Sequence, residues 1–314
     1  MPYDLADGFA KISKLGMEQL EPYLTTVCHR SEVADTRISL NCHHVALDGS
    51  GQPRLIDLTE ALAEWMVDYA IPRRALLAIQ NEPDHVRRRK TLALRKEAKN
   101  TFKKNGMSGE QGEMLMFVIS EAILGLPQLL CKMDLKTDPE MHFHGLDGVH
   151  CGVGSNKNLA VYWCESKVEK DVGDAMGNAL DGLKPFLLSA GTGDKDKKRE
   201  LALVNRYMDL GDEGLQKMVL DALDPSKVEF NSIEWRGICF IGFDTNLYPD
   251  GPNKKSAETL NNEFNVEIEK WMKSLKTRAE NRKLESFDIH FIFVPFGFCE
   301  DFRKAMSAAL EVNS

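Results

Sequence analysis

A tripeptide made of an acidic residue, any residue and a lysine occurs at four places in this chain of 314 residues. The four copies are Glu97-Ala-Lys99, Asp134-Leu-Lys136, Glu165-Ser-Lys167 and Asp196-Lys-Lys198. The copy at Glu97 falls in a basic, helix-like stretch, where side chains two positions apart face different ways. The copy at Asp196 falls in a charged stretch. Only the copy at Glu165 follows a strongly strand-like run, residues 159–164, so only there does the local pattern point to a site.

Side chains alternate along a strand, so Glu165 and Lys167 should project from one face about 7 Å apart. Placing a carboxylate and an ammonium at the end of a buried strand is costly, because burial removes their hydration. The pair therefore indicates chemistry rather than packing.

Two more carboxylates can reach this pair. Asp147 lies between two glycines, in His144-Gly-Leu-Asp-Gly-Val-His150, and a hairpin through residues 152–158 would bring it near Glu165. Glu113 lies at the start of a predicted helix. Mg²⁺ and Mn²⁺ bind through a few carboxylate oxygens and keep several waters. Such an ion polarises a phosphate and activates an attacking water, which a nearby lysine can hold.

Each of these residues also has a structural interpretation. Asp147 suits an ordinary turn, and Glu113 could simply complement a helix dipole. His142, His144 and His150 alternate like strand residues; we expect His144 and His150 to orient Asp147 or contact phosphate rather than bind metal. Lys132 is either solvated at a strand edge or in contact with substrate, and the sequence leaves that choice open.

The elements that must position these residues follow from the spacing of apolar residues. Strands are predicted at 37–47, 129–135, 141–151, 159–167, 237–243 and 287–295. Helices are predicted at 58–69, 84–102, 112–124, 171–188, 200–223, 256–284 and 299–310. This alternation favours an α/β fold, a mixed sheet flanked by helices. No Pro- or Ser-rich linker divides the chain, so we expect one compact unit, with an N-terminal α/β elaboration (1–108) before the site-bearing core and its C-terminal strand and helices (109–314).

The order of these features resembles the PD-(D/E)xK nuclease core: a helix with a glutamate, a strand, an aspartate at the end of a second strand, then Glu-x-Lys on a third. More specifically, several segments are similar to the HamA family, the effector subunit of the Hachiman anti-phage system. They are Gly112-Glu113, Lys132-Met133, residues 144–150, Glu165-Ser-Lys167, the run 291–296 and Phe302-Arg303. The likeness spans about residues 30–311 and is strongest at 109–170. Leu146 stands where the name-giving proline would be.

The resemblance implies specific roles. Asp147 and Glu165 would bind Mg²⁺ or Mn²⁺, Lys167 would assist catalysis, and Glu113 would be the helix carboxylate that completes the metal and catalytic set. It also implies a helicase-like partner subunit, HamB, that restrains the nuclease until DNA damage or phage replication is sensed.

A basic stretch gives a second candidate surface. Residues 86–104 hold nine basic side chains against one acidic side chain, Glu97, although the whole chain has a net charge of −8. We expect DNA-backbone contacts from Arg87, Arg88, Arg89, Lys90, Arg95, Lys96 and Lys99. A solvated charged face and contact with an acidic partner remain alternatives.

The remaining composition indicates a cytoplasmic protein. Seven scattered cysteines without a CxxC pair favour reduced thiols over a disulfide framework or a zinc site. Neither a signal peptide nor a membrane-spanning segment is expected.

The sequence therefore predicts a metal-dependent DNA nuclease that acts as the effector of a two-component defence system. The main rival is a non-catalytic adaptor that keeps a nuclease-like fold and binds DNA or a helicase. An enzyme acting on small phosphate esters is a more distant third, which the basic stretch argues against. DNA against RNA, nicking against double-strand cutting, sequence preference and the activating trigger stay open.

Overall fold

A computed structural model describes residues 4–12, 15–105, 109–135, 145–189, 195–249 and 254–310. Its centre is a six-stranded mixed sheet in the order β1-β2-β6-β5-β4-β3. The strands are β1 (Leu24–Glu32), β2 (Ile38–Val45), β3 (Gly148–Val153), β4 (Leu159–Glu169), β5 (Glu234–Asp244) and β6 (Ile289–Phe296). The four inner strands run parallel, and the edge strands β1 and β3 are antiparallel to their neighbours. The α/β prediction with a mixed sheet is confirmed.

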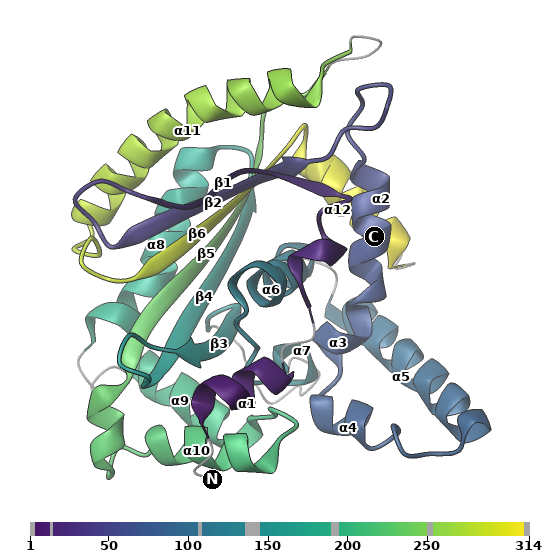
Figure 1. Ribbon diagram of the computed structural model, residues 1–314, viewed down its shortest axis with the longest axis vertical. Helices are drawn as coiled ribbons and strands as arrows, with labels where there is room; N and C mark the ends of the chain where they lie inside the picture. Colours follow the sequence, from purple (N-terminus) through teal and green to yellow (C-terminus); the bar gives the residue numbers. More distant parts are fainter. Residues whose placement is uncertain are drawn as a thin grey trace.

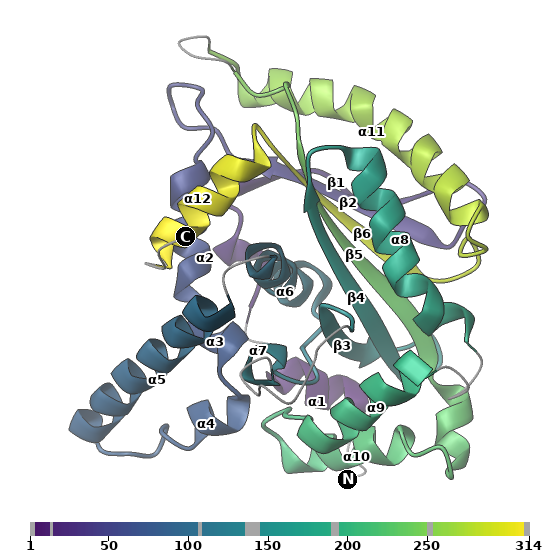
Figure 2. The same cartoon turned by 180° about the vertical axis from the view of Figure 1, so that it is seen from behind.

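Helices cover both faces of the sheet. They are α1 (Leu5–Ile12), α2 (Leu55–Glu64), α3 (Met66–Ala70), α4 (Arg73–Leu77), α5 (Asp84–Asn105), α6 (Glu110–Leu124), α7 (Lys132–Leu135), α8 (Val172–Leu188), α9 (Lys195–Tyr207), α10 (Glu213–Ala222), α11 (Ala257–Glu280) and α12 (Cys299–Ala309), with short 3₁₀ turns at Met17–Gln19 and Val228–Ser232. Figures 1 and 2 show α8 and α11 on one side of the sheet, and α2, α6 and α12 on the other.

The two-sided cover explains the composition of the inner strands. Strands β5 and β6 are almost continuously apolar and buried along most of their length, as expected for parallel strands covered on both faces. The helix after β4 begins where the sequence predicts, because the side chain of Asp171 accepts a hydrogen bond from the Asp174 N–H (2.9 Å) and caps α8.

Two predicted strands differ from the structure. The strand predicted at 129–135 is wrong: Gln128 makes an isolated bridge to His150, and helix α7 follows. A short apolar run fits a strand or a buried helical turn equally well, and the helical turn is what forms here. The strand predicted at 141–151 is confirmed only from Gly148, where β3 begins, because residues 136–144 lie outside the described residues.

The helix predicted at 200–223 is two helices, α9 and α10. Gly211 has a positive φ of 71°, a conformation that interrupts a helix and that glycine adopts at no steric cost. The side chain of Asp212 then accepts a hydrogen bond from the Leu215 N–H (2.9 Å) and starts α10.

None of the helices in the described part of the chain combines the length and the apolar composition that a bilayer crossing requires.

Candidate active site

The candidate site lies on strand β4 at the point where its neighbour β3 stops. The two strands pair from Val153↔Leu159 to Gly148↔Cys164, while β4 continues for five more residues. Glu165 and Lys167 therefore lie on the extension, where β4 has a strand only on its β5 side among the described residues. The hairpin expected between the two strands is confirmed, but Glu165 lies inside β4 rather than at its end.

Asp147 occupies the position that β3 leaves open. Its backbone N–H donates to the carbonyl of Cys164 (3.0 Å), and its carboxylate oxygen Oδ2 accepts from the N–H of Ser166 (2.8 Å). The carboxylate thus accepts the hydrogen bond from β4 that a further residue of β3 would have accepted, and backbone groups of β4 hold Asp147 beside that strand. This bonding fixes Asp147 next to the Glu-x-Lys pair.

Lys167 joins the two carboxylates. Its Nζ donates to Oε2 of Glu165 at 2.7 Å and lies 4.0 Å from Oδ2 of Asp147. Glu165 is largely buried, with a side-chain exposure of 8%, whereas Lys167 and Asp147 keep 27% and 21%. The three side chains therefore form one cluster that is open to solvent on one side.

A glycine on helix α8 makes room for the Glu165 carboxylate. A Cβ added at Gly182 would lie 2.5 Å from Cδ of Glu165, closer than real Cβ contacts. On the opposite face a Cβ at Gly112 would lie 2.7 Å from both Oγ of Ser166 and Cγ2 of Val168, so this glycine lets the start of α6 approach β4. Sequence reasoning did not identify the role of Gly182, because nothing local distinguishes it from other helical glycines.

Glu113 is brought in by that close approach of α6. Its side chain is buried, and its Oε2 accepts a hydrogen bond from the Tyr69 hydroxyl (3.1 Å). Its charge is near enough to raise the pKa of both Asp147 and Glu165. Because it lies in the first turn of α6, its interpretation as a dipole partner also stays open.

The electrostatics are those of crowded carboxylates. Burial, followed by repulsion from Glu113 and Glu165, raises the pKa of Asp147 to about 7. Burial likewise raises the pKa of Glu165, although Lys167 opposes the shift. Burial lowers the pKa of Lys167, but the two carboxylates outweigh it and the net pKa is raised, so the ammonium form is favoured. The cluster has more negative charge than the one lysine neutralises.

Divalent cations suit this donor set chemically. Oxygen-only donors with an excess of negative charge match the preference of Mg²⁺ and Mn²⁺. Within the described residues, however, no group of three or more histidine, cysteine or carboxylate side chains has converged on a common metal position. A cation would therefore have to draw the carboxylates together and displace part of the Lys167–Glu165 contact.

The histidines predicted nearby are placed differently. His150 is fully buried, its Nδ1 lies 2.7 Å from the carbonyl of Leu126, and burial lowers its pKa to about 4. It therefore packs inside the fold, away from solvent, and its hydrogen bond goes to Leu126 rather than to Asp147. His142 and His144 lie outside the described residues.

Lys132 is neither solvated nor placed to meet a substrate, the two possibilities that the sequence left open. Its side chain is 1% exposed and pairs with the buried carboxylate of Glu200 on α9.

The basic stretch forms helix α5, which projects from the body of the molecule (Figures 1 and 2). Its exposed basic side chains are Arg87, Arg88, Arg89, Lys90, Arg95 and Lys96, while Lys99 is half-buried. Arg87 and Lys90 pair with Asp84 and Glu82. At the other end Phe102 is buried and packs against Tyr69, with ring centroids 5.9 Å apart. Since Tyr69 also binds Glu113, the basic helix is anchored beside the carboxylate cluster.

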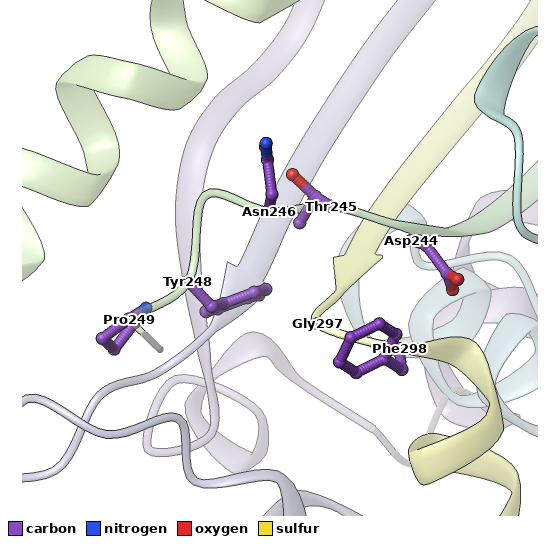
Figure 3. Close-up of a pocket in the computed structure, with 7 residues that line it drawn as sticks. All are labelled: Asp244, Thr245, Asn246, Tyr248, Pro249, Gly297 and Phe298. Carbon is purple, nitrogen blue, oxygen red and sulfur yellow. The ribbon is translucent and has the colours of Figure 1, made fainter. Parts of the chain in front are cut away.

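A pocket of about 480 Å³ lies elsewhere, at the carboxyl ends of β5 and β6 (Figure 3). It is lined by Asp244, Thr245, Asn246, Tyr248, Pro249, Gly297 and Phe298. Asp244 accepts a hydrogen bond from the Cys299 N–H (2.6 Å) at the start of α12, and the Tyr248 hydroxyl donates to the carbonyl of Pro295 (2.8 Å). These contacts account for the two residues structurally, and none of the predicted site residues is among those that line the pocket.

A search of curated proteins gave no match. A family model of HamA, in contrast, matches residues 21–310, which includes every residue of the carboxylate cluster and the basic helix. The match covers nearly the whole chain, and the chain therefore belongs to the HamA family.

Proposed function

We propose that this chain is a metal-dependent nuclease that hydrolyses phosphodiester bonds in DNA, as the effector of the Hachiman anti-phage system. The observation that carries the proposal is the cluster of Asp147, Glu165 and Lys167, which forms where β4 extends beyond its pairing with β3. Family membership supports the defence setting. The elements around the cluster, α6, β3, β4 and α8, would form the PD-(D/E)xK core within residues 109–314.

Asp147 and Glu165 would hold Mg²⁺ or Mn²⁺, with Glu113 as the third carboxylate. The bound ion would polarise the scissile phosphate and lower the pKa of an attacking water. On the protein side, the excess negative charge supports this assignment, because a cation would relieve the repulsion from Glu113 and Glu165 that, after burial, raises the pKa of Asp147.

Lys167 would act as a charged hydrogen-bond donor rather than as a base. Its raised pKa keeps the ammonium protonated near neutral pH. Its contact with Glu165 fixes the direction in which Nζ points. From that position it could hold a water molecule or offset negative charge that builds up on the phosphate in the transition state.

Helix α5 would contact the DNA backbone. Its residues 87–93 and 95–97 are exposed, and four basic side chains among them, Arg88, Arg89, Arg95 and Lys96, make no ion pair within the described part of the chain. Each phosphate contact contributes about 0.9 to the slope of log affinity against log salt concentration.

The triple variant Arg87→Gln, Arg88→Gln, Arg89→Gln should therefore weaken DNA binding similarly across sequences and flatten the salt slope by up to about three units. Fluorescence anisotropy at several salt concentrations measures this. An unchanged slope would assign the helix to solvent or to a partner protein.

A direct test of the activity is incubation of the purified chain with plasmid DNA, with Mg²⁺ or Mn²⁺ and with EDTA. Nicked or linear product should appear only with the metal, and Lys167→Ala should reduce it strongly while thermal melting stays near that of the wild type. An equal rate for Lys167→Ala would contradict the assignment. No cleavage by a folded, metal-loaded wild type would favour the adaptor reading, in which the fold binds DNA or the proposed helicase-like partner, HamB, without catalysis.

A further inference from the structure

A buried ion pair lies behind the carboxylate cluster and has no part in the function proposed above. Nζ of Lys132 on α7 lies 3.2 Å from Oε2 of Glu200 on α9, and the two side chains are only 1% and 3% exposed. Burying two charges costs several kcal/mol each, and an apolar pair of similar volume is often equally stable or better. Stability alone is therefore a poor explanation for this pair.

Both members of the pair contact the short segment that leads into Asp147. The Lys132 ammonium donates to the carbonyl of Leu146, the residue directly before Asp147. A Cβ added at Gly145 would lie 2.0 Å from Oε1 of Glu200, so the chain at Gly145 runs directly against that carboxylate. The segment 145–147 thus packs against Glu200 at Gly145 and accepts a hydrogen bond from Lys132 at Leu146.

The same segment also depends on β4. The Asp147 N–H donates to the carbonyl of Cys164, and its carboxylate accepts from Ser166. Asp147 is consequently held by hydrogen bonds to the edge of β4, and the residue before it is held by Lys132 of the buried ion pair. Lys132 has an electrostatic link to the cluster as well, because its charge opposes the rise that burial causes in the pKa of Glu165.

We propose that Lys132 and Glu200 are positioning residues that clamp the segment 145–147 and so hold Asp147 in place to receive a divalent cation. The effect on metal affinity rests on the proposed function. The clamp itself does not, since it concerns the folded, metal-free chain.

The chain offers a matched control. Lys197, also on α9, is equally buried, but its Nζ donates to the carbonyl of Ser189 (3.1 Å) and lies 4.2 Å from the ring centre of Trp235. Lys197→Met therefore removes a buried ammonium from the same part of the fold without touching segment 145–147.

The first measurement is hydrogen exchange of the metal-free protein, read in peptides that span residues 145–149. The Asp147 amide is hydrogen-bonded to Cys164, so its exchange reports how often the segment leaves β4. Lys132→Met should speed this exchange at least about tenfold, and Lys132→Arg should restore part of the protection. Lys197→Met should leave exchange at 145–149 as in the wild type.

The second measurement is Mn²⁺ affinity by calorimetry. Loss of an outer partner that orients a metal ligand typically costs about 10–100-fold in affinity. Lys132→Met and Glu200→Gln should each lose Mn²⁺ affinity within that range, while Lys197→Met should bind Mn²⁺ like the wild type. The double variant Lys132→Met, Glu200→Leu replaces the pair by apolar groups, so it should recover thermal stability without recovering protection at 145–149 or Mn²⁺ affinity.

Unchanged exchange in Lys132→Met overturns the clamp, and so does a double variant that regains both protection and affinity. If Lys132→Met fails to fold, the double variant and Glu200→Gln decide the matter by the same readouts. Faster exchange in the variants together with a wild type that binds no Mn²⁺ would support the clamp and contradict the proposed metal site.

Discussion

Two parts of one sheet, separated by strand β5, differ in what their side chains do. Strand β6, in the middle of the sheet, buries apolar side chains such as Phe291 and Phe293 completely, and its backbone is paired on both sides. The stretch of β4 that extends beyond β3 instead carries Glu165 and Lys167, and the side chain of Asp147 takes the place of a neighbouring strand there. Strand β6 stabilises the fold by apolar burial. The extension of β4 holds charged groups close together, which is energetically unfavourable. Function is expected where local structure is energetically unfavourable but well fixed.

The largest expected contrast is in cleavage. Asp147→Ala and Glu165→Ala each remove a hard ligand, so each should lower cleavage by well over about a hundredfold, beyond what loss of an outer partner costs. Gel analysis of plasmid DNA measures this, with thermal melting as the check on folding. Full activity in either variant would remove these residues from the site.

The second contrast is in stability. Phe293→Ala in β6 should reduce the free energy of unfolding by about 3–5 kcal/mol, because it leaves a cavity in a fully buried region. Glu165→Gln should reduce the free energy of unfolding much less, because it removes a charge from a largely buried position. Chemical denaturation of the two variants provides the comparison. A larger loss for Glu165→Gln would mean that the charged cluster stabilises the fold.

The third contrast depends on pH. The pKa of Asp147 is raised from 3.8 to about 7 in the folded chain. Between these values the unfolded chain has released the proton that the folded chain retains, so the free energy of unfolding falls as pH rises through this window and stays low above it.

Asp147→Asn removes the loss of stability that deprotonation of this carboxyl causes in the folded chain. The metal-free variant should be more stable than the wild type at pH 8, by about 2 kcal/mol, and no more stable at pH 3.5. Added Mg²⁺ should stabilise the wild type and not the variant. Denaturation at the two pH values, with and without Mg²⁺, tests all three statements, and a variant less stable at pH 8 would contradict them.

The smallest contrast separates helix propensity from site geometry. Gly182→Ala should stabilise a helix by about 0.5–1 kcal/mol on propensity alone, yet its Cβ would push the Glu165 carboxylate aside. We expect cleavage to fall about tenfold, a step worth about 1.4 kcal/mol, with little change in melting temperature.

Gly177→Ala on the same helix is the control, because its Cβ would meet only Nη2 of Arg282, at 3.3 Å. It should keep full activity. If both alanine variants cleave alike, the space beside Glu165 has no importance for the reaction.

Much of the fold was predictable from local pattern. Continuous apolar runs identified β4, β5 and β6, and the spacing of apolar residues identified α8. The short apolar run before α7 was not predictable, because its type depends on which neighbours it packs against. Strand β1 was missed for a related reason: its half-exposed, polar sequence becomes a strand by pairing with β2. The division of the chain at residue 108 stays a prediction.

The sequence by itself determined that Glu165 and Lys167 share one face of a strand, because side-chain alternation is a local property of the backbone. The same reasoning could propose Asp147 and Glu113 but could not place them, since each distance depends on where one element ends against another. Tertiary structure decided that Asp147 completes the edge of β4, that Tyr69 holds Glu113, and that Lys132 is buried behind the cluster. These arrangements join residues far apart in the chain, and packing, rather than spacing, brings them together.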